Sequence, residues 1–322
     1  MRLFFLVLLS IVCAPLWALE QVTLQLNWKH QFQFAGYYAA IEKGYFREAG
    51  YEVTLVEAGA SHDPIAAVLK GDARFGVGAS ELALHRARGE PVVALATILQ
   101  HSPLVLIAGT QVANNVHALS GRRIMLMPHE TELYAYLKRE GITRYRAEQH
   151  SFDPADLISG KVDALSGYST DEPFVLDKAA FKYAIFTPRS AGIDFYGDTL
   201  FTTENAINAN RKGVRAFRAA VIKGWEYAMV HPEEIADLIL ARYSKRHSKD
   251  HLLFEAAEMQ RLMQPELVEI GHMTEGRWQQ IAQHYAELGM VSPNTKISGL
   301  IYEDKPQKLP VWVLPLMVIG VL

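Results

Sequence analysis

The chain has 322 residues, half of them hydrophobic, which is long enough for two lobes that each bury a core. Its 32 basic and 35 acidic residues give a formal net charge of −3, and like charges form no long run. This balance argues against a surface for nucleic acids or other polyanions, so we expect no nucleic-acid partner.

The amino-terminal segment, MRLFFLVLLSIVCAPLWA, places one arginine before an apolar stretch that ends in small residues. This pattern predicts a secretory signal peptide over residues 1–18, cleaved after Ala18, with a retained membrane anchor as the alternative. The only cysteine, Cys13, lies in this segment and follows the bulky Val12, which disfavours a lipoprotein site. The mature chain would therefore have no disulfide and no thiolate chemistry, and we expect it in the periplasm.

Repeated strand–helix units follow the amino-terminal segment. Apolar and polar residues alternate in the strands, while the helices begin at capping residues such as Asp63 and end at glycines. The expected strands are 22–27, 51–59, 74–78 and 91–99, and the helices between them end at Gly44, Gly71 and Gly89. This alternation predicts an α/β fold with a parallel, doubly wound sheet, in which a ligand binds beyond the carboxyl ends of the strands.

The strand–helix pattern restarts after PLVLIAG (103–109) and forms a second, smaller set up to residue 179. From Asn208 onward the chain changes to long amphipathic helices. We therefore expect lobe 1 to contain residues 19–110 and 200–303, and lobe 2 to contain residues 111–199. Two crossover segments, near 108–113 and 196–202, would let the lobes close on a ligand like a hinge.

The carboxyl-terminal segment becomes apolar after the polar stretch YEDKPQK. A helical membrane span needs about 20 apolar residues, so LPVWVLPLMVIGVL (309–322) is expected to begin one. Trp312 would lie at the membrane interface. A hydrophobic tail that docks on the domain is the alternative.

Five motifs in combination indicate a family: LNW, GYF before EAGYEV, GDARFGVG…RARGEPVVALA, GKVDALSGYSTDEP and GIDFYGDTLFTT. Over residues 20–300 they resemble the thiamine-pyrimidine-synthase-like (SsuA/THI5-like) branch of the type 2 periplasmic binding proteins. The resemblance implies a two-lobed fold with a hinge of two crossovers and a helical return to lobe 1. It also implies a small planar ligand of the pyrimidine or thiamine-precursor class.

The family contains sensor domains, transport components and one enzyme. The chain is most similar to the sensor-type members, which implies anchoring in the inner membrane and a cytoplasmic signalling module beyond residue 322. The substrate-binding component of an ABC importer is the second interpretation. The enzyme of the family is the third interpretation. That enzyme uses a lysine, a histidine and a cysteine-rich iron motif, but in this chain the matching positions are Gly78, Ser80–Glu81 and the stretch 194–198. Without that amine and those thiols, we expect no catalysis and no cofactor.

Aromatic and polar residues gather in NWKHQFQFAGYY (27–38), where the first strand ends. Trp28 can stack on a planar ring while the Asn27 amide satisfies its heteroatoms; a tryptophan that caps the core is the alternative. Tyr37 or Tyr38 would add a wall, and only one of them can point inward because adjacent helical residues face different ways. Phe32 and Phe34 are expected to pack in the core.

Further candidates lie in the second half of the fold. The family's pyrimidine binders use a tyrosine and a glutamate in the motif that matches Tyr168 and Glu172, although Glu172 also suits the start of a helix. Tyr196 and Asp198 should lie where lobe 2 returns to lobe 1, with Gly197 permitting close backbone approach or a structural turn.

Four other polar residues remain. Ser80 can offer hydroxyl and N–H groups to an anionic group, or simply cap a helix. His247 and His251 have the i, i+4 spacing of metal ligands, but no third ligand is near them in the sequence, so we expect no metal. His62 is near the crevice expected in lobe 1.

Overall fold

The computed structural model describes residues 18–58, 63–127 and 130–304. The expected signal peptide, His62 and the expected start of a membrane span therefore lie outside the described residues. Within the described ranges, no helix combines the length and the apolar character that a membrane crossing requires.

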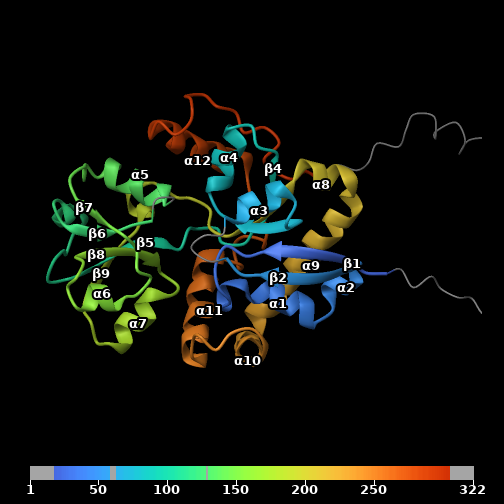
Figure 1. The fold of residues 1–322 in the computed structure, drawn as a ribbon, viewed down its shortest axis with the longest axis horizontal. Helices are drawn as coiled ribbons and strands as arrows, with labels where there is room; N and C mark the ends of the chain where they lie inside the picture. Colours follow the sequence, from blue (N-terminus) through green and yellow to red (C-terminus); the bar gives the residue numbers. More distant parts are fainter. Residues whose placement is uncertain (1–17, 59–62, 128–129, 305–322) are drawn as a thin grey trace, which may run out of the picture.

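Two five-stranded sheets form the centres of two lobes (Figure 1). The lobe 1 sheet has the order β2-β1-β3-β10-β4 and contains β1 (Glu20–Gln25), β2 (Tyr51–Val56), β3 (Phe75–Gly78), β4 (Val92–Thr97) and β10 (Thr199–Thr203). The lobe 2 sheet has the order β7-β6-β8-β5-β9 and contains β5 (Leu104–Gly109), β6 (Arg123–Met125), β7 (Arg146–Glu148), β8 (Ala164–Tyr168) and β9 (Tyr183–Phe186).

Each sheet is mixed, so the expectation of wholly parallel sheets is wrong in detail. β10 runs antiparallel to both of its neighbours, and so does β5. The remaining pairs, such as β1 with β2 and β6 with β8, are parallel, as the strand–helix units predict. The two antiparallel strands are the ones that follow the passages of the chain between the lobes.

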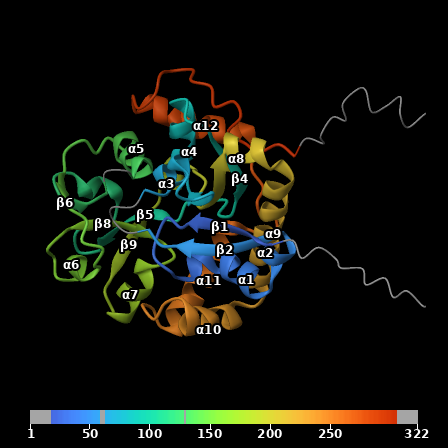
Figure 2. The same ribbon diagram turned by 45° about the vertical axis from the view of Figure 1, so that its right-hand side comes forward.

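Helices cover both sheets, and the carboxyl-terminal helices return to lobe 1 (Figures 1 and 2). Lobe 1 has η1 (Phe32–Phe34), α1 (Ala35–Glu42), α2 (Tyr45–Glu48), α3 (Pro64–Lys70) and α4 (Glu81–Ala87), and lobe 2 has η2 (Val116–Leu119), α5 (Thr131–Arg139), α6 (Ala155–Ile158), α7 (Glu172–Lys178) and η3 (Pro188–Ala191). The return comprises α8 (Glu204–Ala209), α9 (Arg211–Val230), α10 (Pro232–Arg242), α11 (Lys249–Met263) and α12 (Glu275–Glu287).

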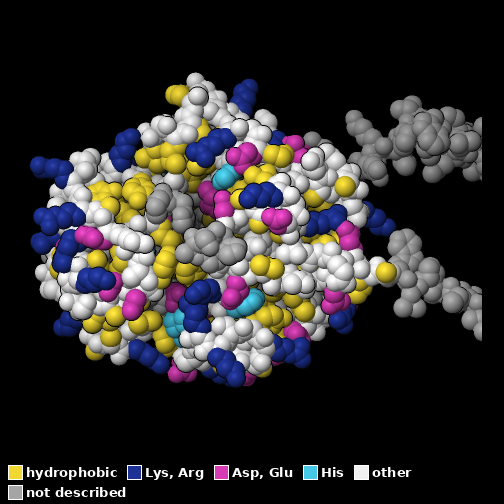
Figure 3. Space-filling model, in the orientation of Figure 1, with side chains coloured by type: hydrophobic (Ala, Val, Ile, Leu, Met, Phe, Trp, Pro, Cys, Tyr) yellow, Lys and Arg dark blue, Asp and Glu magenta, His cyan; other side chains and the backbone are white. Residues whose placement is uncertain are grey.

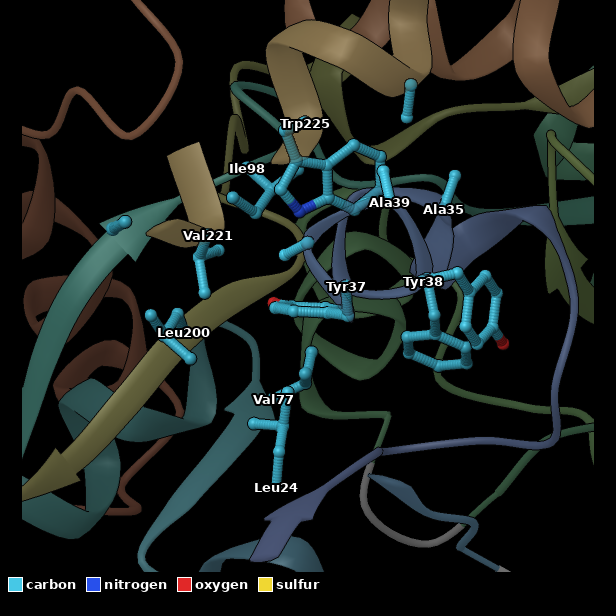
Figure 4. Close-up of a cluster of buried hydrophobic side chains, with 14 of the residues drawn as sticks. Leu24, Ala35, Tyr37, Tyr38, Ala39, Val77, Ile98, Leu200, Val221 and Trp225 are labelled. Carbon is cyan, nitrogen blue, oxygen red and sulfur yellow. The ribbon is translucent and has the colours of Figure 1, made fainter. Parts of the chain in front are cut away.

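Helix α1 packs tightly on α9 in the core of lobe 1 (Figure 4). The Tyr37 ring meets the Trp225 indole edge-on, with centroids 5.9 Å apart. A Cβ built on Gly224 would lie 2.1 Å from the Gly36 carbonyl oxygen, so only glycine allows the two helices to approach this closely. The expected packing role of Phe32 and Phe34 is confirmed, because both side chains are fully buried.

The two crossover segments, residues 98–103 and 193–198, lie side by side. The first one precedes β5, not residues 108–113 as expected, because β5 pairs with β8 and β9 in the lobe 2 sheet. The backbone N–H of Gly197 donates to Leu99 O at 3.0 Å, and that of Ser102 donates to Phe195 O at 2.9 Å. A Cβ on Gly197 would lie 2.8 Å from Leu99 Cβ, which confirms the expected close backbone approach.

Candidate functional site

A buried carboxylate stands where the second crossover enters lobe 1. Asp198 is 2% exposed and accepts hydrogen bonds from Asn27 Nδ2 at 3.1 Å and from Gln33 Nε2 at 2.8 Å. Burial raises the pKa of Asp198 to about 6, although the two amide donors oppose the rise. The structure thus brings together two predicted site residues, Asn27 and Asp198, and adds the amide of Gln33, which was not among the predicted residues.

An aromatic pair spans the boundary between the lobes. Trp28 of lobe 1 lies against Phe152 of lobe 2, with ring centroids 5.1 Å apart and planes tilted by 42°. Phe152 has a φ of 61°, an uncommon backbone conformation for a bulky side chain, and its ring is partly exposed. Trp28 is only partly buried and also packs against the lobe 1 core, so it can present a ring face at this boundary, and its stacking on a ligand stays a prediction.

On the lobe 2 side, the end of β8 turns directly into α7. Glu172 is the first residue of α7, and its Oε2 accepts a hydrogen bond from the backbone N–H of Tyr168 at 2.6 Å. A Cβ on Gly167 would meet this carboxylate at 2.6 Å, so the glycine in the GYSTDEP motif makes room for it. The two residues selected from this motif therefore lie together at the turn.

Carboxylates from both lobes surround Tyr168. Burial raises the pKa of the Tyr168 hydroxyl well above its usual value, and the nearby carboxylates of Asp198, Glu81, Glu130 and Glu132 raise it further. Asp198 and Glu81 belong to lobe 1, and Glu130 and Glu132 belong to lobe 2. Figure 3 shows acidic and histidine side chains near the boundary between the lobes, while lysines and arginines spread over both lobes.

Three buried carboxyl groups at the boundary between the lobes have pKa values well above the usual value for a glutamate. Burial raises the pKa of Glu130 to about 7 and that of Glu132 to about 8, although the Met127 N–H donates to Glu130 and Ser102 opposes the rise at Glu132. Burial, together with repulsion from the neighbouring Asp171, raises the pKa of Glu172 to about 8. Displaced pKa values clustered at the boundary between two lobes are typical of a site where a ligand supplies the missing hydrogen bonds or charge.

Three predicted site residues have other contacts. Tyr37 is 1% exposed in the lobe 1 core and is therefore not a wall of the interlobe site. The Ser80 hydroxyl lies 2.9 Å from the Tyr285 hydroxyl of α12 and does not cap α4. Tyr196 packs on Trp278 and under Arg277, and its hydroxyl accepts a hydrogen bond from the Thr274 N–H at 3.1 Å. These residues support the site through packing, because other protein groups already use their polar atoms or enclose their rings.

Four contributors were missed by the sequence analysis: Gln33, Phe152, Glu130 and Glu132. Gln33 lies in the aromatic stretch already selected, so its amide was a visible signal. Glu130 and Glu132 begin a helix in the sequence, where acidic residues are ordinary, and only burial distinguishes them. Phe152 gave no signal, because its role depends on the left-handed backbone conformation and the opposite lobe.

The expectation about His247 and His251 also needs correction. The structure brings a third possible metal ligand, Asp171, close to both histidines although it is distant from them in the sequence. One ligand atom from each of the three residues lies within 4.8 Å of the others. Asp171 precedes α7 of lobe 2, while the histidines flank the start of α11.

Curated relatives cover about two thirds of the chain. A formylaminopyrimidine-binding protein of Halalkalibacterium halodurans is 27% identical over 69% of this chain and 71% of its own length. The riboflavin-binding protein RibY of Chloroflexus aurantiacus is 26% identical over 69% of this chain and 66% of its own length. A 4-amino-5-hydroxymethyl-2-methylpyrimidine phosphate synthase of Saccharomyces cerevisiae is 23% identical over 66% of this chain and 68% of its own length.

Solved structures show the same fold. The periplasmic aliphatic sulphonate-binding protein SsuA of Escherichia coli superimposes with a TM-score of 0.64 at 14% identity, over 91% of this chain and 96% of its own. A Candida albicans protein with the generic periplasmic binding protein fold gives a TM-score of 0.67 at 13% identity, over 91% of this chain and all of its own. The two-lobed, type 2 periplasmic binding protein fold is thereby confirmed.

A family profile adds direct evidence from sequence. The profile described as NMT1/THI5 like matches residues 31–235, which is more than half of the chain. The matched range runs from the aromatic stretch after β1 through lobe 2 to α10. The chain belongs to the NMT1/THI5-like family.

Proposed function

We propose that this chain binds a small, flat, amine-bearing ligand of the pyrimidine or thiamine-precursor class outside the cytoplasm and does not transform it. The observation that carries the proposal is the convergence of carboxylates from both lobes around Tyr168. Asp198 and Glu81 approach it from lobe 1, and Glu172, Glu130 and Glu132 approach it from lobe 2.

Carboxylates at such a boundary favour ligands that donate hydrogen bonds. An ionised carboxylate accepts from an exocyclic amine more strongly than a neutral group does, so a bound amine would favour the ionised form of carboxyl groups whose pKa values are raised in the free protein. A sulfonate or phosphate would add negative charge beside these groups, so the solved sulphonate-binding relatives share the fold without sharing this preference. A flat ring suits the site because Trp28 and Phe152 present aromatic faces from opposite lobes.

Two named relatives support this class of ligand. A formylaminopyrimidine and riboflavin, the ligands in their names, are both flat heteroaromatic molecules with amine or imide donors. The chain departs from the enzyme of the family at the positions that would supply a Schiff-base amine and iron-binding thiols: Gly78 stands at one, and the stretch 194–198 has no cysteine. This departure supports binding without turnover.

The finer proposal is that the domain is the sensor of a membrane signalling protein, anchored in the inner membrane. The apolar run over residues 309–322 and the similarity to sensor-type members support it. The importer component is the alternative, favoured by relatives that are named as binding proteins. Reading the gene beyond codon 322 discriminates between them, since a completed span and a cytoplasmic signalling module would support the sensor.

Ligand preference is tested by calorimetric titration of the purified protein with three probes: a 4-aminopyrimidine, its N,N-dimethyl derivative and a short alkanesulfonate. We expect binding of the aminopyrimidine only, and at a pH above the Glu172 pKa of about 8, Glu172→Gln should weaken it by about 1 kcal/mol or more because the ionised acceptor is lost. The matched control is Glu266→Gln, an exposed glutamate far from Tyr168 in the sequence and packed on no site residue named here. Equal affinity for the dimethyl derivative, or preferred binding of the sulfonate, would refute the proposed ligand class.

A further inference from the structure

Two histidines and an aspartate meet where α7 of lobe 2 faces α11 of lobe 1. Asp171 Oδ1 lies 2.8 Å from His251 Nε2 and 4.0 Å from His247 Nε2. The two imidazole rings lie side by side with centroids 3.9 Å apart. One donor atom from each of the three side chains lies within 4.8 Å of the other two, which is close enough for all three to bind one metal ion. In the sequence, Asp171 is 76 residues from His247 and 80 residues from His251.

Both imidazole Nε2 atoms are sealed from solvent. The exposed fractions of the three side chains are 4% for His251, 11% for His247 and 15% for Asp171. His247 Nε2 has no hydrogen-bond partner among the described residues and lies 4.0 Å from Asp171 Oδ1, whereas His251 Nε2 contacts the same oxygen at 2.8 Å. Because a buried polar atom without a partner costs free energy, the His247 nitrogen beside this histidine–aspartate pair indicates a group that binds all three side chains.

We propose that Asp171, His247 and His251 form a binding site for Zn²⁺ or a similar divalent transition-metal ion. Two imidazole nitrogens and one carboxylate oxygen are a donor set that suits such ions and does not suit Mg²⁺ or Ca²⁺, which prefer oxygen ligands alone. Tetrahedral coordination of the ion would leave a fourth position for water or another ligand. The Phe174 ring stacks on His251 with centroids 4.4 Å apart and holds that imidazole in place.

The site connects the two lobes. Asp171 is fixed to lobe 2 as the residue before α7, and α11 packs in the lobe 1 core through residues such as Leu252 and Met259. A metal ion bound by all three side chains therefore requires the lobes to be in contact and stabilises the closed arrangement. Asp171 precedes Glu172, so an ion here would also position the helix start that carries a candidate ligand contact.

The test uses Zn²⁺ alone, with no organic ligand, so its result is independent of the proposed function. Chelator-treated full chain is titrated with Zn²⁺ in a calorimeter, and X-ray absorption at the zinc edge identifies the ligands. We expect one ion per chain with two imidazole nitrogens, and a loss of affinity of at least about tenfold in each of Asp171→Asn, His247→Gln and His251→Gln, since even outer groups of metal sites are worth that much. The control His272→Gln, an exposed histidine, should bind Zn²⁺ normally.

His247→Gln keeps the test decisive, because His247 is less buried than His251 and its replacement disturbs packing less. Circular dichroism establishes that each variant is folded before titration. Absence of stoichiometric Zn²⁺ binding to the wild-type chain would overturn the proposal and leave Asp171 and His251 as an ordinary interlobe contact. Equal binding by wild type and the three variants, or equal affinity for Mg²⁺, would also overturn it.

Discussion

The unfolding free energy of the wild-type protein should fall as the pH rises because of Glu132, and Glu132→Gln should abolish this fall. The Glu132 side chain is 5% exposed, and burial raises its pKa from an ordinary 4.5 to about 8 although Ser102 donates a hydrogen bond to it. Between these two values the folded protein keeps a proton that the unfolded chain has lost. The unfolding free energy therefore falls as the pH rises through this window.

The size of this effect follows from the width of the window. Each pKa unit corresponds to about 1.4 kcal/mol, so the wild type loses about 5 kcal/mol by pH 8 through this group. A glutamine side chain at this position cannot ionise and can still accept the hydrogen bond from Ser102. The difference in unfolding free energy between Glu132→Gln and wild type should therefore be small near the lower end of the window and reach about 5 kcal/mol near its upper end.

Urea unfolding followed by tryptophan fluorescence at several pH values across this window measures the difference. Glu266→Gln serves as the control, because Glu266 is exposed, and its difference from wild type should stay constant with pH. A Glu132→Gln difference that does not grow with pH would refute the assignment of a raised pKa. A variant destabilised equally at every pH would show instead that the glutamate contributes only packing.

Two further predictions concern the aromatic stretch and the helix pair beneath it. Trp28→Ala should weaken binding of an aminopyrimidine by about 1–3 kcal/mol, as expected for a lost stacking contact. Phe32→Leu should lower the melting temperature with little change in affinity. Calorimetry and thermal melts compare the two variants, and unchanged affinity in Trp28→Ala would make that ring a core residue. Gly224→Ala should cost about 1–3 kcal/mol of unfolding free energy or more, because its Cβ would lie 2.1 Å from Gly36 O. Gly276→Ala, whose Cβ meets nothing within 4 Å in α12, should instead be neutral or stabilising, and equal losses in the two variants would contradict this explanation.

The sequence by itself determined the elements whose signals are local. The helix expected over residues 130–139 is α5, and the one expected over 275–289 is α12, because a glycine follows each helix within two residues and Thr274 caps the start of α12. The family motifs indicated the two-lobed fold. The pairing of Tyr168 with Glu172 was also predictable, since four residues at a strand-to-helix turn bring the two together.

Only the tertiary structure decided which polar groups are buried and which lobes they face. Glu130 and Glu132 look like ordinary helix-start residues until packing removes them from water. Tyr37 looked like a wall of the site, but contact with Trp225 of α9, distant in sequence, places it in the core. Contacts between segments distant in sequence also place β5 in the second sheet and bring Asp171 close to His247 and His251. Such contacts depend on the three-dimensional path of the chain, whereas periodicity and capping report only on neighbouring residues.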